Sequence, residues 1–230
     1  MVECVVYTAL TDKYFLNSFY PSKDIDYVAY MENGTELKSP WQKKKLERKG
    51  HPKVDTARYK MLPHKYFNCE YSVWLDSMIV PKRGPLLEAV KHILKNGDIA
   101  FWMHPVRRCI YEESLAIVEN KKYKNNIEII YDQINRYAEE GMPRDFGIFA
   151  GGIVIRRHTK EINEFGEYWY DEYLKGSKND QLSLAYTAWK TQLPVVRVNR
   201  GIVHQNDFFH YVGGKIIVKN GETWWVGREQ

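Results

Sequence analysis

The chain has 230 residues, 44% of them hydrophobic and 14% aromatic, and a formal net charge of +5 at pH 7. This composition is typical of an ordered globular protein and excludes the disordered and fibrous classes. The length suits one α/β domain with a substantial core, so we expect a single domain over residues 1–230, although two small domains would fit the same length.

The cysteine content and the absence of long apolar runs limit the class of protein further. The three cysteines, Cys4, Cys69 and Cys109, are too few and too scattered for a disulfide framework, which favours a reducing compartment such as the cytoplasm. We find no signal-peptide pattern and no apolar run long enough to cross a bilayer, so we expect no membrane span.

Positive charge is concentrated in residues 41–53, which contain six lysines and arginines. This run is most simply a solvated loop or short helix, and attraction of a phosphorylated ligand is the functional alternative. Binding of nucleic acid through the same run is a third hypothesis, but no nucleic-acid motif accompanies the charge, so we expect no nucleic-acid partner.

The first half of the chain alternates apolar strands with helices. Residues 2–10 predict a buried first strand, with Thr8 and Ala9 near its ligand-binding end, and residues 26–30 predict a second. Residues 55–67 have helical spacing as far as Pro63 and carry Arg58 and Lys60 just before the next strand. A helix over 85–96 and a strand over 98–103 follow, the strand ending in polar residues that include His104, Arg107 and Arg108.

Residues 71–78, YSVWLDSM, are an apolar run that ends abruptly at Asp76. A strand of this kind crosses a sheet between two covered faces, and its end lies where such sheets bind ligands. Asp76 is therefore either a site residue or only a cap for the turn before residues 81–84, and the octapeptide alone does not decide.

The second half continues the alternation. Helices are predicted over 111–122, 126–140, 160–174 and 182–190. Residues 146–155 predict a loop that leads into a strand, 194–198 a late strand and 213–225 a terminal hairpin. Asp180 lies at the start of the helix over 182–190, and His204 and His210 follow the last strand. Strands alternating with helices predict an α/β fold with a mostly parallel central sheet flanked by helices.

Several common site motifs are absent from the sequence: the G-x-G-x-x-G and P-loop glycine patterns, the G-x-S-x-G elbow, H-E-x-x-H and paired C-x-x-C. The remaining candidates for a functional site are the polar residues at strand ends. One carboxylate and one or two imidazoles can hold Mg²⁺ or Mn²⁺, which is commonly completed by substrate phosphates. A metal on a diphosphate makes it a better leaving group, so the residues suit a nucleotide-sugar site.

Five segments together resemble a known family: RYKMLPH (58–64), YSVWLD (71–76), HPVRRCIYEE (104–113), GGIVIRRHT (151–159) and DQLS (180–183). They are similar to the ordered motifs of the glycosyltransferase-like family that includes the plant mucilage-related proteins. The resemblance implies a single GT-A-like nucleotide-binding domain that transfers a sugar from a nucleoside diphosphate, UDP above all, to a glycan or glycoprotein. Within the family the chain looks most like the N-terminal glycosyltransferase domain of the chlorella-virus enzymes that glycosylate a capsid protein, which implies a capsid acceptor, the host cytoplasm and further domains of a longer polypeptide.

The resemblance also assigns a metal and donor site. It places Asp76, with Ser77 and Met78, on the motif that binds Mn²⁺ or Mg²⁺ and the donor diphosphate. The usual D-x-D is here Asp76-Ser77-Met78, so only one motif carboxylate is present. We expect a histidine to complete the metal site, His210 in preference to His204.

Other roles follow from position and resemblance together. Asp180 is the candidate beside the reacting sugar carbon, as a base if the reaction inverts or as a stabiliser of positive charge if it retains; it is also a plain helix cap. Arg58 is expected to bind diphosphate or hold Asp76, with a surface ion pair as the alternative. Thr8 and Ala9 are expected to meet the nucleotide base through backbone groups.

The strand-end cluster of His104, Arg107 and Arg108 is assigned to acceptor or phosphate, unless the two arginines only pair with Glu112 and Glu113. The missing second carboxylate also suggests a different class of protein, a non-catalytic module that binds nucleotide sugars or carbohydrate.

Overall fold

The computed structural model describes residues 2–11, 16–32, 37, 39–119, 126–199 and 206–212, and the backbone alone of 215–219 and 222–226. A seven-stranded sheet forms its centre, with strand order β3-β2-β1-β4-β7-β6-β8. The strands are β1 (Cys4–Leu10), β2 (Ile25–Met31), β3 (Gln42–Lys45), β4 (Tyr71–Leu75), β6 (Ile99–Met103), β7 (Phe149–Arg157) and β8 (Val196–Val198). Only β7 pairs antiparallel with its neighbours, β4 and β6, so the sheet is mostly parallel.

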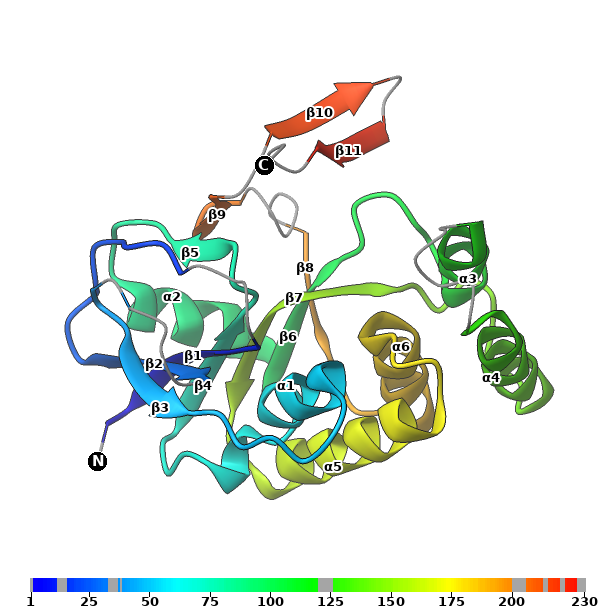
Figure 1. The fold of residues 1–230 in the computed structure, drawn as a ribbon, viewed down its shortest axis with the longest axis horizontal. Helices are drawn as coiled ribbons and strands as arrows, with labels where there is room; N and C mark the ends of the chain where they lie inside the picture. The colour runs from blue at the N-terminus through cyan, green and yellow to red at the C-terminus, as the bar shows by residue number, and fades with distance from the viewer. Residues whose placement is uncertain are drawn as a thin grey trace.

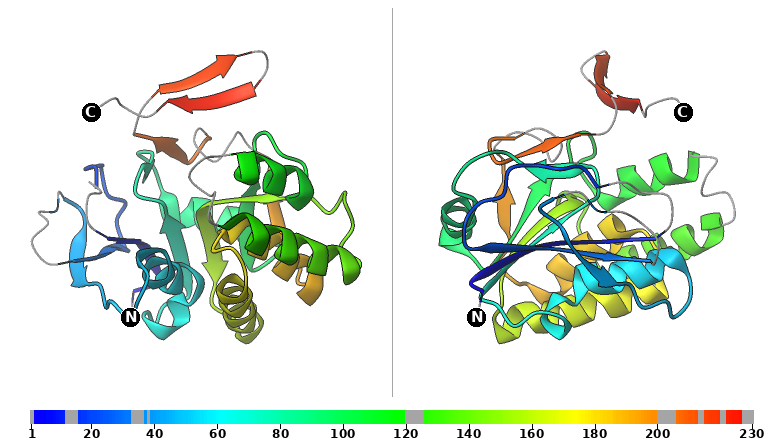
Figure 2. Two further views of the ribbon diagram at one scale, coloured as in Figure 1. Left: turned by 45° about the vertical axis from the view of Figure 1, so that its right-hand side comes forward. Right: turned by 60° about the vertical axis from the view of Figure 1, so that its left-hand side comes forward.

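Helices cover both faces of this sheet (Figures 1 and 2). One face packs against α2 (Leu86–Ile93). The other is covered by α1 (Pro52–Met61), α5 (Lys160–Lys175) and α6 (Asp180–Thr191). α3 (Ile110–Glu119) and α4 (Ile127–Glu139) belong to the same core but lie beyond α6, at the side of the sheet (Figure 1). Side chains alternate along β1 accordingly: Val5 and Tyr7 join the core under α1 and α5, and Cys4 and Val6 join the core under α2.

Local sequence explains where the helices near the site begin. The Thr159 side chain accepts a hydrogen bond from the Ile162 amide at the start of α5, and the Asn179 side chain caps α6 in the same way. α1 begins at Pro52, a residue whose fixed φ suits the first helical position.

The predicted α/β class with a mostly parallel sheet flanked by helices is confirmed, and the resemblance to GT-A-like folds agrees with it. Three short strands were not predicted: β3, β5 (Ile79–Pro81) and β9 (Phe209–Tyr211). β3 corrects the expectation of a loop or helix in the basic run, because Lys43 to Lys45 form an exposed edge strand, where lysines discourage pairing with other chains. The terminal hairpin is present as β10 (Lys215–Lys219) and β11 (Glu222–Val226).

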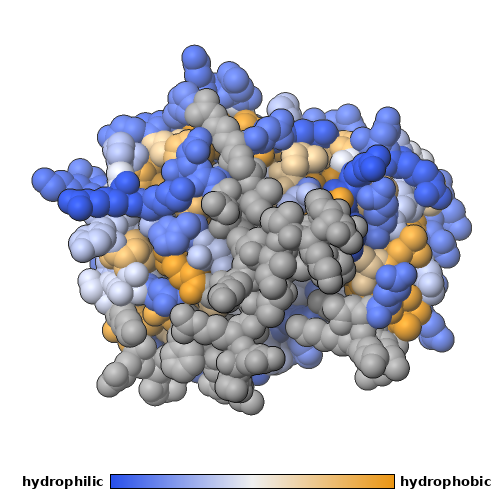
Figure 3. Space-filling model, turned by 90° about the horizontal axis from the view of Figure 1, so that it is seen from above, coloured by the Kyte–Doolittle hydropathy of each residue, from blue (hydrophilic) through white to orange (hydrophobic). Residues whose placement is uncertain are grey.

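The face seen in Figure 3 is mostly polar where its residues are described. Figure 3 shows hydrophilic side chains around one face, with hydrophobic residues in small separate groups among the described residues. No helix in the described part of the chain is long and apolar enough to cross a membrane. The single domain over residues 1–230 stays a prediction.

Candidate functional site

A cleft of about 780 Å³ opens at the carboxyl ends of β1 and β4. Its other walls are one face of α1, the loop between α5 and α6, and Tyr211 of β9. The volume lies in the range of small-molecule and cofactor sites, and the carboxyl ends of parallel strands are where α/β sheets bind ligands.

Asp76 follows β4 and lines this cleft with about half of its side chain exposed (52%). Its backbone amide continues the β4–β7 ladder to the Gly152 carbonyl (2.9 Å), which fixes the backbone position. Its carboxylate accepts a hydrogen bond from the Trp74 indole (2.8 Å). The side chain is therefore aimed into the cleft by the strand that precedes it.

Lys60 of α1 lies between Asp76 and Asp180. Its ammonium forms an ion pair with Asp180 and lies 3.7 Å from Asp76 Oδ1, and its side chain is only 7% exposed. Burial alone would lower the pKa of Lys60, but the two carboxylates outweigh burial and raise it. For Asp180, burial would raise the pKa, but the Lys60 ammonium and backbone amides lower it, so Asp180 is an anion at neutral pH.

α1 presents Lys60 to the cleft because of helical spacing. Lys53, Thr56, Ala57 and Lys60 recur at intervals of three and four residues, which places them on one helix face, and all four line the cleft. Arg58 lies two residues from Lys60, about 200° around the helix, and so points away. Its guanidinium donates to the Glu47 carbonyl (2.9 Å).

The role of holding Asp76, which we expected of Arg58, is therefore performed by Lys60. Lys60 has no role in the prediction from sequence. Its spacing of three and four residues from Ala57 and Thr56 is the signal that could have placed it on the cleft-lining face of α1.

Neighbouring backbone and side chains fix this group in place. The buried Arg156 of β7 donates to the Lys60 carbonyl and to the Tyr7 hydroxyl, each at 2.8 Å. Gly151 of β7 lies directly against the ion pair: a Cβ there would be 2.7 Å from Asp180 Oδ2 and 3.0 Å from Lys60 Nζ. The close approach that a glycine permits at this position is thus to the Asp180 and Lys60 side chains.

The other expected donor residues also line the cleft: Thr8, Ala9, Ser77 and Met78. Thr8 is 1% exposed, and its hydroxyl has no hydrogen-bond partner among the described residues. A buried hydroxyl without a partner is costly unless a ligand or water satisfies it. Thr8 is therefore a suitable contact for a polar ligand.

His104, Arg107 and Arg108 follow β6 and are not among the described residues that line the cleft. His104 Nδ1 accepts from the backbone amides of Val106 (3.2 Å) and Arg107 (2.8 Å), so the proton is on Nε2, which lies 3.8 Å from the Glu113 carboxylate. The Arg107 side chain is also 3.8 Å from Glu113, and the Arg108 amide donates to Glu112.

Glu113 of α3 is the centre of this cluster and is 12% exposed. Burial raises its pKa to about 7; Arg107 opposes the rise, and the charge of Asp180 adds to it. The alternative that the arginines only pair with Glu112 and Glu113 is met in part: the Arg107 side chain pairs with Glu113, whereas Arg108 contacts Glu112 through its backbone amide. An acceptor role stays a prediction.

The expected metal ligands are only partly placed at the cleft. His210 lies in β9 next to Tyr211, and because strand side chains alternate, Tyr211 lines the cleft while His210 points to the opposite face. Burial and nearby Lys82 lower the pKa of His210. His204 lies outside the described residues. In the part of the chain that is described, no group of three or more metal-ligating side chains occurs.

Comparison with known proteins connects this site to a family. The pattern that defines the TOD1/MUCI70 glycosyltransferase-like domain matches residues 48–210. A probable hexosyltransferase of Arabidopsis thaliana, MUCI70, is 27% identical over 137 residues, which cover 55% of this chain and 23% of that protein. The crystal structure of mouse xyloside xylosyltransferase 1, without ligand, matches 85% of this chain and 84% of its own with a TM-score of 0.47 and 10% identity.

The chain thus spans about a quarter of the length of the plant relative. The matched region, residues 48–210, contains α1, Asp76 and Asp180, and with them every charged residue among the described residues that line the cleft.

Proposed function

Since the chain belongs to the TOD1/MUCI70 glycosyltransferase-like domain family, we propose that it transfers a hexose from a nucleoside-diphosphate donor, a UDP-sugar, to a glycan or glycoprotein. The observation that carries this proposal is the group formed by Asp76, Lys60 and Asp180 at the carboxyl ends of the strands. It puts two fixed carboxylates and a cation beside a cleft large enough for a nucleotide sugar.

In this proposal the nucleotide lies over the ends of β1 and β4. Thr8 supplies a hydroxyl that no described residue satisfies, and Ala9 offers backbone groups beside it. Ser77 and Met78 form the wall next to Asp76. The diphosphate then lies near the lysines of α1, which attract its charge.

A divalent cation, Mn²⁺ or Mg²⁺, fits this cleft with Asp76 as its protein ligand. Mg²⁺ is commonly held by one or two carboxylates together with substrate phosphates and water, so a single motif carboxylate is enough. Asp76 is half exposed, and its Oδ1 is already held by Trp74. Such an ion would neutralise charge on the departing diphosphate.

The state of Asp180 favours one of its two possible roles. A general base works best when its pKa is near the operating pH, whereas the ion pair with Lys60 lowers the pKa of Asp180. An anion held rigidly beside the sugar instead stabilises positive charge that develops at the reacting carbon. We therefore propose transfer with retention of configuration, with Lys60 and Gly151 fixing the place of Asp180.

The acceptor is proposed from family membership and from the resemblance to the chlorella-virus enzymes: a glycoprotein, with viral capsid protein as one candidate, glycosylated in the cytoplasm. A test is transfer from a panel of UDP-sugars to deglycosylated capsid protein and to plant cell-wall glycans. Transfer to neither would remove this part of the proposal and leave donor chemistry to be tested separately.

Titration calorimetry with UDP, with and without Mn²⁺, tests donor and metal binding, and release of UDP from UDP-sugars tests catalysis. We expect Asp76→Ala to abolish the Mn²⁺-dependent part of UDP binding, and Asp180→Asn to keep donor affinity but lose turnover. UDP binding without any turnover on the whole sugar panel would instead support a non-catalytic binding module. If Asp76→Ala leaves the Mn²⁺ effect unchanged, the metal assignment is wrong.

A further inference from the structure

The loop between α5 and α6 forms one wall of the cleft and carries Asp180 into it. Lys178, Asn179 and Asp180 all line the cleft. The Asn179 side chain accepts from the amides of Gln181 (3.0 Å) and Leu182 (3.1 Å), so the end of the loop and the first turn of α6 are one rigid unit. The Trp169 indole of α5 donates to the Asp180 carbonyl (3.2 Å), and Lys60 pairs with its carboxylate. The path by which the loop enters this unit depends in addition on what holds the residues just before Asn179.

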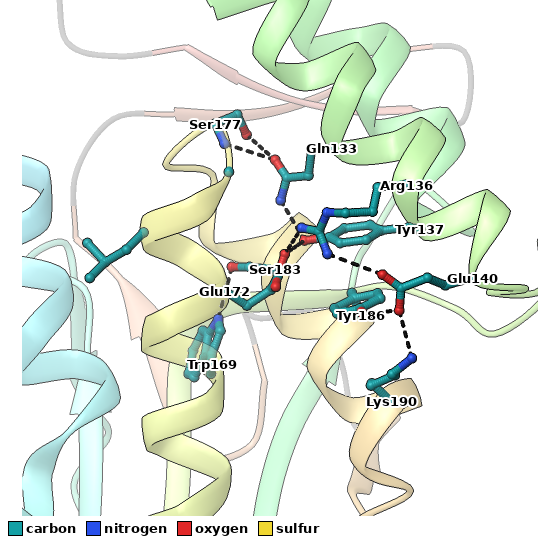
Figure 4. Close-up of polar contacts among 12 residues, drawn as sticks. Gln133, Arg136, Tyr137, Glu140, Trp169, Glu172, Ser177, Ser183, Tyr186 and Lys190 are labelled. Atoms are coloured by element: carbon teal, nitrogen blue, oxygen red, sulfur yellow. Dashed lines mark hydrogen bonds and ion pairs between the residues drawn. The ribbon is translucent and has the colours of Figure 1, made fainter.

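A single side chain from another helix holds that part of the loop. Gln133 of α4 is 3% exposed, and its Oε1 accepts from both the backbone amide (2.9 Å) and the hydroxyl (2.8 Å) of Ser177. Figure 4 shows it pointing from α4 to the loop. The approach is so close that a Cβ at Gly176 would lie 2.5 Å from the Gln133 amide group.

The other end of Gln133 is fixed as well. Its Nε2 donates to the Tyr137 hydroxyl (2.7 Å), which in turn donates to Glu172 of α5 (2.8 Å). Arg136 completes the group with an ion pair to Glu172, which is 2% exposed (Figure 4). The Tyr137 ring also stacks on Tyr186 of α6, with centroids 3.9 Å apart.

This network joins α4, α5 and α6 at the root of the loop. The amide of Gln133 is used at both ends, because its oxygen accepts twice and its nitrogen is the donor that orients Tyr137. An apolar residue of similar size would fill the same space but would leave the Ser177 amide and hydroxyl without partners. A fully satisfied buried network selects one conformation, which is what precise placement of a reacting group requires.

We propose that Gln133 is a positioning residue for Asp180: it holds Ser177, and through Asn179 it fixes the carboxylate relative to Lys60 and the donor sugar. This inference rests on the proposed transferase function, but its first test does not depend on turnover. Gln133 is not among the described residues that line the cleft, so in this proposal it acts through the loop.

The first experiment compares Gln133→Leu with the unaltered chain by hydrogen–deuterium exchange of peptides covering residues 174–184. We expect faster exchange in those residues and unchanged exchange in β1 and β4. A matched control is Ser114→Ala in α3, away from the loop. It removes a buried hydroxyl that donates a hydrogen bond to the Tyr111 carbonyl (2.8 Å). Unchanged exchange of the loop in Gln133→Leu would overturn the proposal whether or not the chain is an active enzyme.

The second experiment measures UDP release per folded molecule. We expect Gln133→Leu to lower kcat about tenfold or more, because sub-ångström misplacement of a reacting group is costly, while the KM for the donor changes less than about twofold. Ser177→Ala, which keeps the backbone hydrogen bond and loses only the hydroxyl, should give a smaller loss of the same kind and covers the case in which Gln133→Leu does not fold. Loss of thermal stability with kcat unchanged would mean a purely structural role.

A third variant gives a reversible readout. In Gln133→Glu, the ionised side chain can accept from Ser177 but cannot donate to Tyr137, whereas the protonated side chain can do both. We expect its kcat, relative to that of the unaltered chain at the same pH, to rise as pH falls. A ratio independent of pH would contradict the role assigned to the Gln133 nitrogen. If the unaltered chain releases no UDP, the proposed function fails while the exchange experiment still decides the loop contact.

Discussion

Gly151 is the position at which the smallest change should most affect the site. It faces the Lys60–Asp180 ion pair, and a methyl group there would lie 2.7 Å from Asp180 Oδ2 and 3.0 Å from Lys60 Nζ. Ordinary contacts of this kind begin at 3.4 Å, so Gly151→Ala forces the carboxylate to move by about 0.7 Å. About one third of the Asp180 side chain is exposed (32%), so it can move into the cleft without disturbing the core.

The expected consequence is a loss of rate with little loss of stability. Misplacement by about 1 Å can cost about 100-fold in rate, so we expect kcat to fall about 10- to 100-fold, or about 1.4 to 2.7 kcal/mol in the barrier. Because no buried contact is lost, the free energy of unfolding should change by less than about 1 kcal/mol.

The assay is UDP release from a UDP-sugar under saturating donor, with donor affinity from calorimetry and stability from urea unfolding. Gly50→Ala is the matched control, since a methyl group there meets nothing within 4 Å. If Gly151→Ala keeps kcat within about twofold of the unaltered chain, then Asp180 is not held in a demanding position and the mechanism proposed for it is wrong.

Three further predictions address single groups of the site. Lys60→Met should raise the pKa of Asp180, because the ion pair that lowers this pKa is lost. The pH below which kcat falls should therefore move upward. If that pH is the same in the variant and the unaltered chain, the pairing of Lys60 with Asp180 is contradicted. Thr8→Val removes a buried hydroxyl that has no described partner, so stability should be unchanged or rise by up to about 1 kcal/mol while donor affinity falls about three- to tenfold. Thr187→Val, at an equally buried hydroxyl without a described partner in α6, is its control and should leave donor affinity unchanged. Glu113→Gln should be more stable than the unaltered chain at pH 8 but not at pH 4. A carboxyl whose folded-state pKa is raised to about 7 costs stability as pH rises from about 4.5 through 7, by at most about 3 kcal/mol. Thermal unfolding of both chains at both pH values measures this, and an equal difference in stability at pH 4 and pH 8 would contradict the raised pKa.

Most of the fold follows from local patterns in the sequence. β-branched and aromatic runs predict the long strands, and helical spacing with capping residues predicts α2, α5 and α6, because these elements bury one continuous face. The strands β3, β5 and β9 have three or four residues each and no such pattern. They form because a neighbouring strand offers unpaired backbone groups, which is a property of the tertiary structure.

A site residue could be predicted from the sequence only where its position depends on a single strand or helix. Asp76 ends a strand, so its place at the sheet edge follows from the apolar run before it. The partner of Asp76 depends on the rotation of α1 about its axis, and a candidate named by charge and proximity in sequence, Arg58, proved to lie on the wrong face. Gln133 was beyond prediction, because its two contacts lie four and forty-four residues away and only packing of three helices brings them together.

The charges of the cleft bear on the proposal that a metal ion helps to bind the donor. Among the described lining residues, three lysines face two aspartates, a net charge of +1. Lys60 is engaged by both aspartates, and the Lys178 ammonium donates to the carbonyls of Leu174 (2.5 Å) and Gly176 (3.0 Å) at the end of α5. Lys53 adds one positive charge, against the several negative charges that a diphosphate carries. A divalent cation on Asp76 would supply the difference, so we expect UDP to bind weakly without Mn²⁺ and calorimetry to show a larger gain from Mn²⁺ than from a matched rise in ionic strength.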